Sequence, residues 1–335
     1  MTTPPTPLSQ ALSLAKAHPR LFSVDMLGHE SSQKKLPIAA FSTGCQDPMA
    51  PMLILIAGLR GNEPVGPEFL LGWMDALRSE VARQRVDALL TRALLVFIPA
   101  ANPWGLAQRS RYNSQGIDLA CNAPVDSSGP TSLLFGGHRL APWLPGFRGK
   151  RGAPMQTEAQ ALVDFVLAQS SSRRHVLVVD CVARRGQGDR LWFPSHHTSE
   201  PMPWLPLMMR FKNLLESKGP ASGLGLTPRW HEGLSHGSIW DHVLRLAPSF
   251  HIEEGRLDLL TLGMGRRARR AALPAEALLS NPASSAFHFR APLAEALMVA
   301  AATSAGWMDI DPSERSALLS AALDAWWTDR APPQT

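Results

Sequence analysis

The most informative part of the sequence is Met52–Gly66, MLILIAGLRGNEPVG. Its first six residues, Met52–Ala57, are apolar and are followed by a glycine, which is typical of a strand buried on both faces of a sheet. Pro64 suits the first turn of a helix, where its missing N–H costs no hydrogen bond. The pattern predicts a strand, a tight turn and a helix. Arg60 and Glu63 would then lie at the carboxyl end of a central strand, where open α/β sheets form their sites.

Further apolar runs predict strands, and amphipathic segments between them predict helices. The predicted strands are Leu36–Thr43, Ala93–Ile98, His175–Val182, a short one near Leu224–Trp230 and, as the last, Ser249–Glu253; the predicted helices are Thr157–Gln169, Trp204–Lys218 and Ser238–Leu246. This alternation indicates an α/β fold with a mixed, largely parallel central sheet flanked by helices. We expect a single domain over residues 11–328, with loose tails at 1–10 and 329–335.

The charge and cysteine content favour a cytoplasmic protein. The net charge is +5, and the basic clusters Arg148–Arg151 and Arg266–Arg270 lack an aromatic platform or a nucleic-acid motif, so we interpret them as solvated surface and do not expect nucleic acid as a partner. Three cysteines form no even disulfide set, which favours a reducing compartment. No signal-peptide core and no apolar run of about 18 residues is present, so we expect no membrane contact. The oligomeric state cannot be predicted.

Four segments in order along the chain resemble the zinc metallocarboxypeptidase family, which includes aspartoacylase and succinylglutamate desuccinylase. The family's metal-binding turn is Gly-x-His-Gly-x-Glu, and residues 58–63 here are Gly-Leu-Arg-Gly-Asn-Glu. The other matching segments are Asn102–Leu119, Val178–Val182 and Pro248–Glu253. Four ordered matches over roughly residues 20–300 are far more specific than any one motif. The resemblance implies a zinc-carboxypeptidase-like domain.

The resemblance also implies a zinc site, but only part of it is present. Glu63 matches one metal ligand, whereas Arg60 and Val182 stand where the family has its two histidine ligands. Arginine keeps its proton and has no lone pair for a metal, and zinc takes about three protein ligands plus water. We therefore expect no cofactor, unless a rearranged site holds zinc.

Two catalytic positions of the family are retained: Glu253 matches the general base, and Arg111 matches the arginine that faces the oxyanion. Ala120 and Cys121 replace the Asn-Arg pair that grips a substrate's terminal carboxylate, so selection of free C-termini is not expected. A positioned acid/base gives about 10²–10⁴-fold acceleration, against about 10⁶-fold or more for working enzymes. Amide hydrolysis by the remaining residues would be weak.

Two interpretations of Arg60 remain open. Its guanidinium could replace the charge of the metal by neutralising Glu63 and Glu253, or it could extend into solvent while the turn serves as scaffold. Cys181 could be a nucleophile, although a small buried strand residue is favoured. The histidines near the strand ends are more simply surface or hydrogen-bonded residues; they are His196, His197, His231, His236 and His251, the last sharing a strand face with Glu253. Ligand contacts are expected from Arg60, Asn113, Asp180, Cys181 and His251.

The favoured function is that of a carboxypeptidase-like protein with a degenerate metal site. It would be catalytically silent or weakly active and would bind a peptide or a small acylated amine in the cleft that the family uses. The alternative is a metal-dependent amide hydrolase, a metallopeptidase or deacylase, with a rearranged metal site. Binding of nucleic acid to the basic surface is a third and weaker hypothesis.

Overall fold

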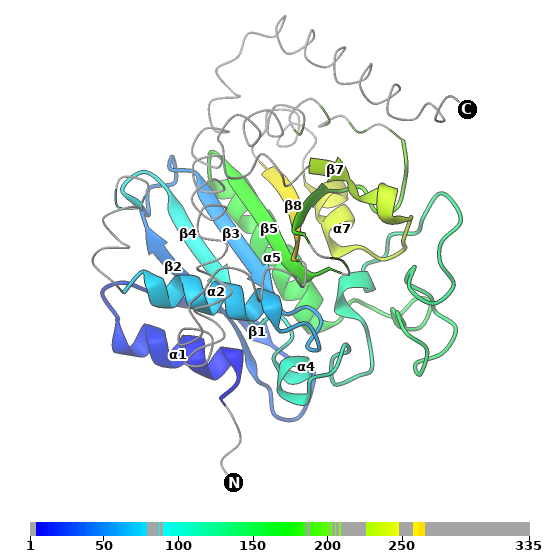
Figure 1. Ribbon diagram of the computed structural model, residues 1–335, viewed down its shortest axis with the longest axis horizontal. Helices are drawn as coiled ribbons and strands as arrows, with labels where there is room; N and C mark the ends of the chain where they lie inside the picture. Colours follow the sequence, from blue (N-terminus) through cyan, green and yellow to red (C-terminus); the bar gives the residue numbers. More distant parts are fainter. Residues whose placement is uncertain are drawn as a thin grey trace, which may run out of the picture.

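The computed structural model describes residues 5–78, 87, 90–184, 186, 188–200, 202, 205, 208, 226–247 and 257–264. These residues form one eight-stranded sheet with the strand order β1-β2-β4-β3-β5-β8-β6-β7 (Figure 1). The strands are β1 Ser23–His29, β2 Pro37–Gly44, β3 Met52–Ala57, β4 Leu94–Ile98, β5 Val176–Ala183, β6 Arg190–Phe193, β7 Leu226–Pro228 and β8 Leu257–Met264. β4, β3, β5 and β8 are mutually parallel, whereas β2 pairs antiparallel with β1 and β4, and β6 pairs antiparallel with β8. The predicted mixed, largely parallel sheet is confirmed.

Helices cover both faces of the sheet. The described helices are α1 Pro7–Ala17, α2 Val65–Ala76, α4 Pro103–Gln108, α5 Thr157–Ser172 and α7 Ile239–Leu246, with short 3₁₀ turns η1 Leu119–Cys121 and η2 Arg229–Glu232. Figure 1 shows α1 and α2 in front of the sheet and α5 and α7 behind it. Each pair of helices closes a separate apolar core against its own face. This is the three-layer arrangement expected when strands alternate with helices.

The strand β3 lies in the middle of the sheet and divides its side chains between the two cores. All six of its residues are buried. Leu53 and Leu55 pack in the core with α1 and α2, and Ile54 and Ile56 pack in the core with α5 and α7. A shift of one residue along the strand would move every side chain to the opposite core. The register of β3 is therefore set by which of its side chains fit each core, and not by the apolar run alone. The predicted strand matches β3 at both ends.

Most of the other predicted elements are present with small shifts at their ends. The prediction that the strand Ser249–Glu253 is the last one is wrong, because β8 follows it in the sequence. Residues 249–253 and most of 204–218 lie outside the described residues, as does the second basic cluster. The strands β1 and β6 were not predicted: β1 is an edge strand with an exposed, partly polar surface, and β6 has only four residues. The limits of the domain remain a prediction.

Among the described residues, no helix is long and apolar enough to cross a membrane.

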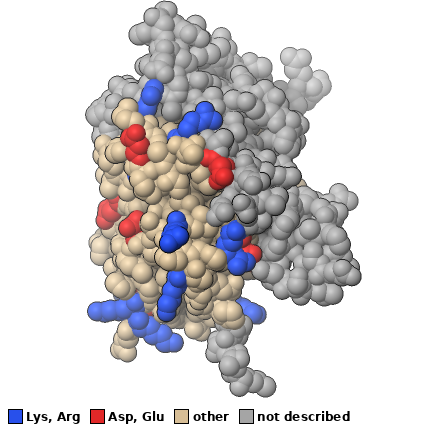
Figure 2. All heavy atoms as spheres, turned by 90° about the vertical axis from the view of Figure 1, so that its left-hand side faces the viewer, with Lys and Arg blue, Asp and Glu red and all other residues tan. Residues whose placement is uncertain are grey.

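The charged side chains on one face of the described surface do not form one extended basic patch (Figure 2). On the face shown in Figure 2, basic and acidic side chains of the described residues are interspersed, apart from a small basic group at the lower end. Arg148 of the first basic cluster is buried; its guanidinium donates to the Val125 carbonyl at 2.9 Å and pairs with Asp126. That arginine therefore braces a loop, and is not part of an open basic surface.

Candidate functional site

The turn after β3 takes its shape from two glycines. Gly58 has a φ of 78°, a left-handed conformation that glycine adopts without strain. A Cβ on Gly61 would lie 1.9 Å from the carbonyl carbon of Gly105, so the two backbones touch in a way that no side chain would allow. Asn102 ties the same segments together, because its side-chain amide donates to the Leu59 carbonyl at 3.2 Å. The turn is thereby pressed against the loop that carries Arg111 and Asp118.

Arg60 does not extend into solvent but joins a compact group of charges. Its Nε lies 3.3 Å from both carboxylate oxygens of Asp118, and its Nη1 lies 3.7 Å from Oε1 of Glu63. Arg111 donates to the same Asp118 from Nε at 2.8 Å and from Nη2 at 2.7 Å. The second oxygen of Glu63 accepts the backbone N–H of Ala183, at the end of β5, at 3.0 Å. Two guanidinium groups and two carboxylates therefore form one balanced group, which we call the Arg60 centre.

The charges of the Arg60 centre stabilise one another. Asp118 has no exposed surface, and its burial opposes ionisation, but Arg60 and Arg111 outweigh burial and hold the pKa of this carboxyl below its usual value. Burial also opposes the charged form of Arg60, but Asp118 and then Glu63 outweigh it, so the pKa of Arg60 is raised. Both groups are therefore ionised at neutral pH. Of the two interpretations of Arg60, the geometry matches neutralisation of carboxylates.

Asp180 on β5 is a buried carboxyl with one occupied oxygen. Its Oδ2 accepts the indole N–H of Trp240 on α7 at 2.8 Å, whereas its Oδ1 has no hydrogen-bond partner among the described residues. Burial raises the pKa of Asp180 to about 7, and the bond from Trp240 acts in the opposite direction. Asp180 is therefore a carboxyl that exchanges a proton near neutral pH.

The other sequence-predicted site residues are not all brought to this place. Asn113 is buried, and its amide is engaged internally: Oδ1 accepts two backbone N–H groups, and Nδ2 donates to Gln156 and Glu158. Cys181 is buried in the core beneath α2, on the face of β5 opposite to Asp180. His251 and Glu253 lie outside the described residues. The structure thus joins Arg60, Glu63 and Arg111, while their ligand and catalytic roles remain predictions.

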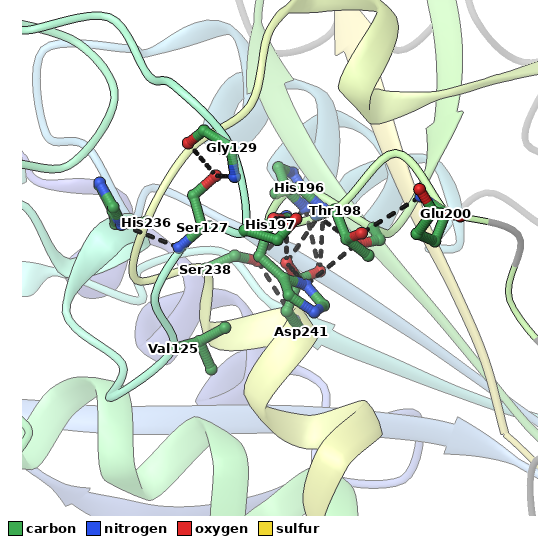
Figure 3. Close-up of polar contacts among 12 residues, drawn as sticks. Val125, Ser127, Gly129, His196, His197, Thr198, Glu200, His236, Ser238 and Asp241 are labelled. Carbon is green, nitrogen blue, oxygen red and sulfur yellow. Dashed lines mark hydrogen bonds and ion pairs between the residues drawn. The ribbon is translucent and has the colours of Figure 1, made fainter.

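Two of the four described histidines near the strand ends share one carboxylate, and the other two are engaged elsewhere. Figure 3 shows His196 and His197, on the turn after β6, meeting Asp241 of α7. Their Nδ1 atoms lie 3.3 and 2.8 Å from its carboxylate, and both backbone N–H groups donate to it. His236 lies apart and accepts the N–H of Ser127 at 2.8 Å, and His231 packs edge-on against Trp230. Within the described part of the chain, no group of three or more side chains suited to a metal ion is present.

Comparison with known proteins supplies the family. The zinc carboxypeptidase family matches residues 9–211, more than half of the chain. The chain belongs to the zinc carboxypeptidase family. Among solved structures, carboxypeptidase A from Helicoverpa armigera is 16% identical with a TM-score of 0.59, covering 87% of this chain and 71% of that one. No match was found among the curated proteins.

Two further solved structures carry the same fold. The metallo-carboxypeptidase from Burkholderia cenocepacia is 18% identical with a TM-score of 0.55, over 87% of this chain and 68% of that one. Bovine thrombin-activatable fibrinolysis inhibitor, solved with a tick carboxypeptidase inhibitor, is 14% identical with a TM-score of 0.57, over 90% of this chain and 97% of that one. At these identities the likeness shows the fold alone.

Within the zinc carboxypeptidase family, this chain is a divergent member that lacks two of the three metal ligands. Glu63 is retained, but Arg60 and Val182 occupy the histidine positions. The donor set does not fit zinc: the retained carboxylate faces a guanidinium at 3.7 Å, and the neighbouring side chain at position 182 has no donor atom.

The sequence interpretation missed two residues that organise the centre. Asp118 lay within a matched motif but received no role, although it is the carboxylate that holds both arginines. A carboxylate seven residues after Arg111, between Ile117 and Leu119, could have indicated a buried ion pair. Nothing in the sequence indicated a role for Trp240 beyond its position near the start of a predicted helix. It contacts Asp180 only because α7 packs against the sheet.

Proposed function

We propose that this protein is a carboxypeptidase-like binding protein that is catalytically silent or weakly active. It takes a peptide or a small acylated amine at the place where its relatives hold their metal and substrate. The observation that supports this most directly is the ion pair of Arg60 with Asp118 and Glu63. A permanent cation occupies the electrostatic role of the metal, and the one retained metal-ligand residue is engaged with it.

The remaining chemistry of the centre suits binding better than hydrolysis. Arg111 donates to Asp118 and its side chain is 20% exposed, so its remaining N–H groups can donate to a carbonyl oxygen of a ligand. Asp180, with its pKa raised to about 7 and an unoccupied oxygen, can accept or donate one hydrogen bond. Without a metal to activate water, a positioned acid/base gives only about 10²–10⁴-fold acceleration. That falls short of ordinary amide hydrolysis by an enzyme.

The experiment measures zinc, hydrolysis and binding on the same preparation. After dialysis against excess zinc and then buffer, we expect well below one zinc per chain and no hydrolysis of N-acyl amino acids above that of the Glu63→Gln control. Binding of the neutral probe N-acetylglycinamide is measured by calorimetry and should weaken when Arg111 is changed to Gln. Stoichiometric zinc that is lost in Glu63→Gln, together with hydrolysis, would establish the rival metal-dependent amide hydrolase instead.

A further inference from the structure

A second group of polar atoms lies on the same face of the sheet as Asp180. In the strand register, Asp180 of β5 is opposite Thr261 of β8, which is opposite Trp192 of β6, which is opposite Thr227 of β7. Directly opposed residues project to the same face of a sheet. With neighbouring strands about 4.8 Å apart, the Trp192 position lies about 10 Å from the Asp180 position. Trp192 therefore belongs to the same side of the molecule as Asp180.

Two arginine guanidinium groups lie close to the indole ring of Trp192. The Cζ of Arg229, the first residue of η2, lies 4.9 Å from the ring centroid, and that of Arg184, just after β5, lies 5.9 Å away. Gly263 of β8 makes room for the indole, since a Cβ there would lie 2.2 Å from the ring. A guanidinium on an indole keeps its in-plane N–H groups available for a planar anion.

Four buried polar atoms of this cluster have no hydrogen-bond partner among the described residues. They are Nε1 of Trp192, Nε of Arg184, Nη1 of Arg229 and Oγ1 of Thr227. The indole N–H lies in the plane of its ring, so stacking by the arginines cannot satisfy it. Buried polar groups are nearly always paired, and each exception needs an explanation. All four can donate, so the missing partner is an acceptor.

The charges around the cluster also favour an anion. The nearby carboxylate of Glu232 is 3.3 Å from Arg190, and Glu63 is engaged in the Arg60 centre. Burial is the main cause that lowers the pKa of Arg229; attraction by Glu232 opposes it, and repulsion from Arg60 acts in the same direction as burial. Both carboxylates thus form their ion pairs with arginines other than Arg184 and Arg229.

We propose that Trp192, Arg184, Arg229 and Thr227 form an oxyanion-binding subsite for the carboxylate or phosphate group of the ligand. The subsite would replace the carboxylate-gripping pair of the relatives, at whose positions this chain has Ala120 and Cys121. This extends the proposed function by giving the ligand an acidic group about 10 Å from Asp180. An N-acylated amino acid or a phosphorylated acyl amine has both parts.

The test compares two probes that differ only in charge. N-acetylglycine carries a carboxylate where N-acetylglycinamide carries a neutral amide, and both are titrated calorimetrically into the full chain at equal ionic strength; inorganic phosphate is the third probe. We expect the acid to bind at least about ten-fold more tightly than the amide. Trp192→Phe keeps the ring and removes one donor, and Arg229→Gln removes the charge; each should weaken binding of the acid roughly 10- to 100-fold. Preferential binding of phosphate would assign the subsite to a phosphorylated ligand.

The control is Arg78→Gln, a 43% exposed arginine just after α2 that pairs with Asp75 and not with the cluster, which should leave the affinity within about two-fold. Trp192→Phe should fold normally, because it removes an unpaired buried donor. Equal affinity for acid and amide, with no saturable phosphate binding, overturns the subsite while leaving the proposed acyl-amine binding intact. Phosphate binding that depends on Trp192 and Arg229, with no binding of either glycine probe, supports the subsite and refutes the proposed ligand. Affinities unchanged in both variants overturn the subsite.

Discussion

Replacing Arg60 with alanine tests whether its charge holds the centre together. The substitution leaves Asp118, which has no exposed surface, with one guanidinium in place of two, and leaves Glu63 with only the backbone N–H of Ala183. Removing one partner of a buried ion pair costs about 3–5 kcal/mol when the other charge is left uncompensated. Arg111 still compensates Asp118, so the loss expected here is about 1–3 kcal/mol in the free energy of unfolding.

The pH dependence of this loss identifies Asp118 as the partner. The pKa of Asp118 is lowered in the folded protein, whereas an unfolded aspartate titrates near 3.9. A lowered pKa contributes stability that is fully present above the unfolded value and is lost as the pH falls toward the folded value. The difference between the wild type and Arg60→Ala should therefore be full at pH 6–7 and shrink below about pH 4.

The assay is urea unfolding followed by circular dichroism across this pH range. Arg190→Ala breaks an exposed ion pair and serves as control, with an expected loss of at most about 1 kcal/mol. A double-mutant cycle with Asp118→Asn should show that the two losses are not additive, because the residues share one contact. An Arg60→Ala protein as stable as the wild type at pH 7 would refute the charge-replacing role and favour the scaffold interpretation.

Three further predictions follow from the same geometry. The single variant Val182→His should not bind zinc. The double variant Arg60→His with Val182→His completes a three-ligand set with Glu63 and should bind about one zinc per chain by elemental analysis. Adding Glu63→Gln to the double variant should abolish this binding. Asp180→Asn should change how stability depends on pH. Because the pKa of Asp180 is raised to about 7 in the folded protein, the wild type should lose up to about 4 kcal/mol in the free energy of unfolding as the pH rises from about 4 to 7. The variant should lack this loss in unfolding titrations. Release of C-terminal residues from peptides, followed chromatographically, should not exceed background even with excess zinc; robust release would contradict the assignment of a lost metal site.

The fold was largely readable from the sequence because its centre is built from long apolar runs. β3 and β5 are buried on both faces, so neither has a polar side that could confuse the period of the pattern. β8 was not predicted although all eight of its residues are buried, because Asp258 and Gly263 interrupt its apolar run. The edge strand β1 was not predicted for a different reason: its sequence, SVDMLGH, has no continuous apolar run, and most of its side chains are exposed.

For the candidate site, the sequence allowed a firm prediction only where the chemistry of a residue type excludes a role. Arginine at position 60 excludes metal ligation by its chemistry, whatever the structure. Its partner could not be derived, because Asp118 is 58 residues away and reaches Arg60 only through the contact of Gly61 with Gly105. The Trp192 cluster depends on four strands being in register, which no local pattern encodes. Long-range polar contacts of this kind follow from packing and not from spacing.

The charge balance explains why the substitution at position 60 and the loss of a ligand at position 182 belong together. Arg60 and Arg111 balance Asp118 and Glu63, so the centre is neutral without a metal. A divalent cation about 4 Å from the Arg60 guanidinium would meet a repulsion of about 8 kcal/mol at an effective dielectric constant of 20. Once arginine is present, a histidine at position 182 has no ion to bind, and an apolar side chain there removes a polar group that would need a partner. Under the proposed function, arginine at position 60 is therefore the substitution that closes the site to metal, and valine at 182 is a change that it permits.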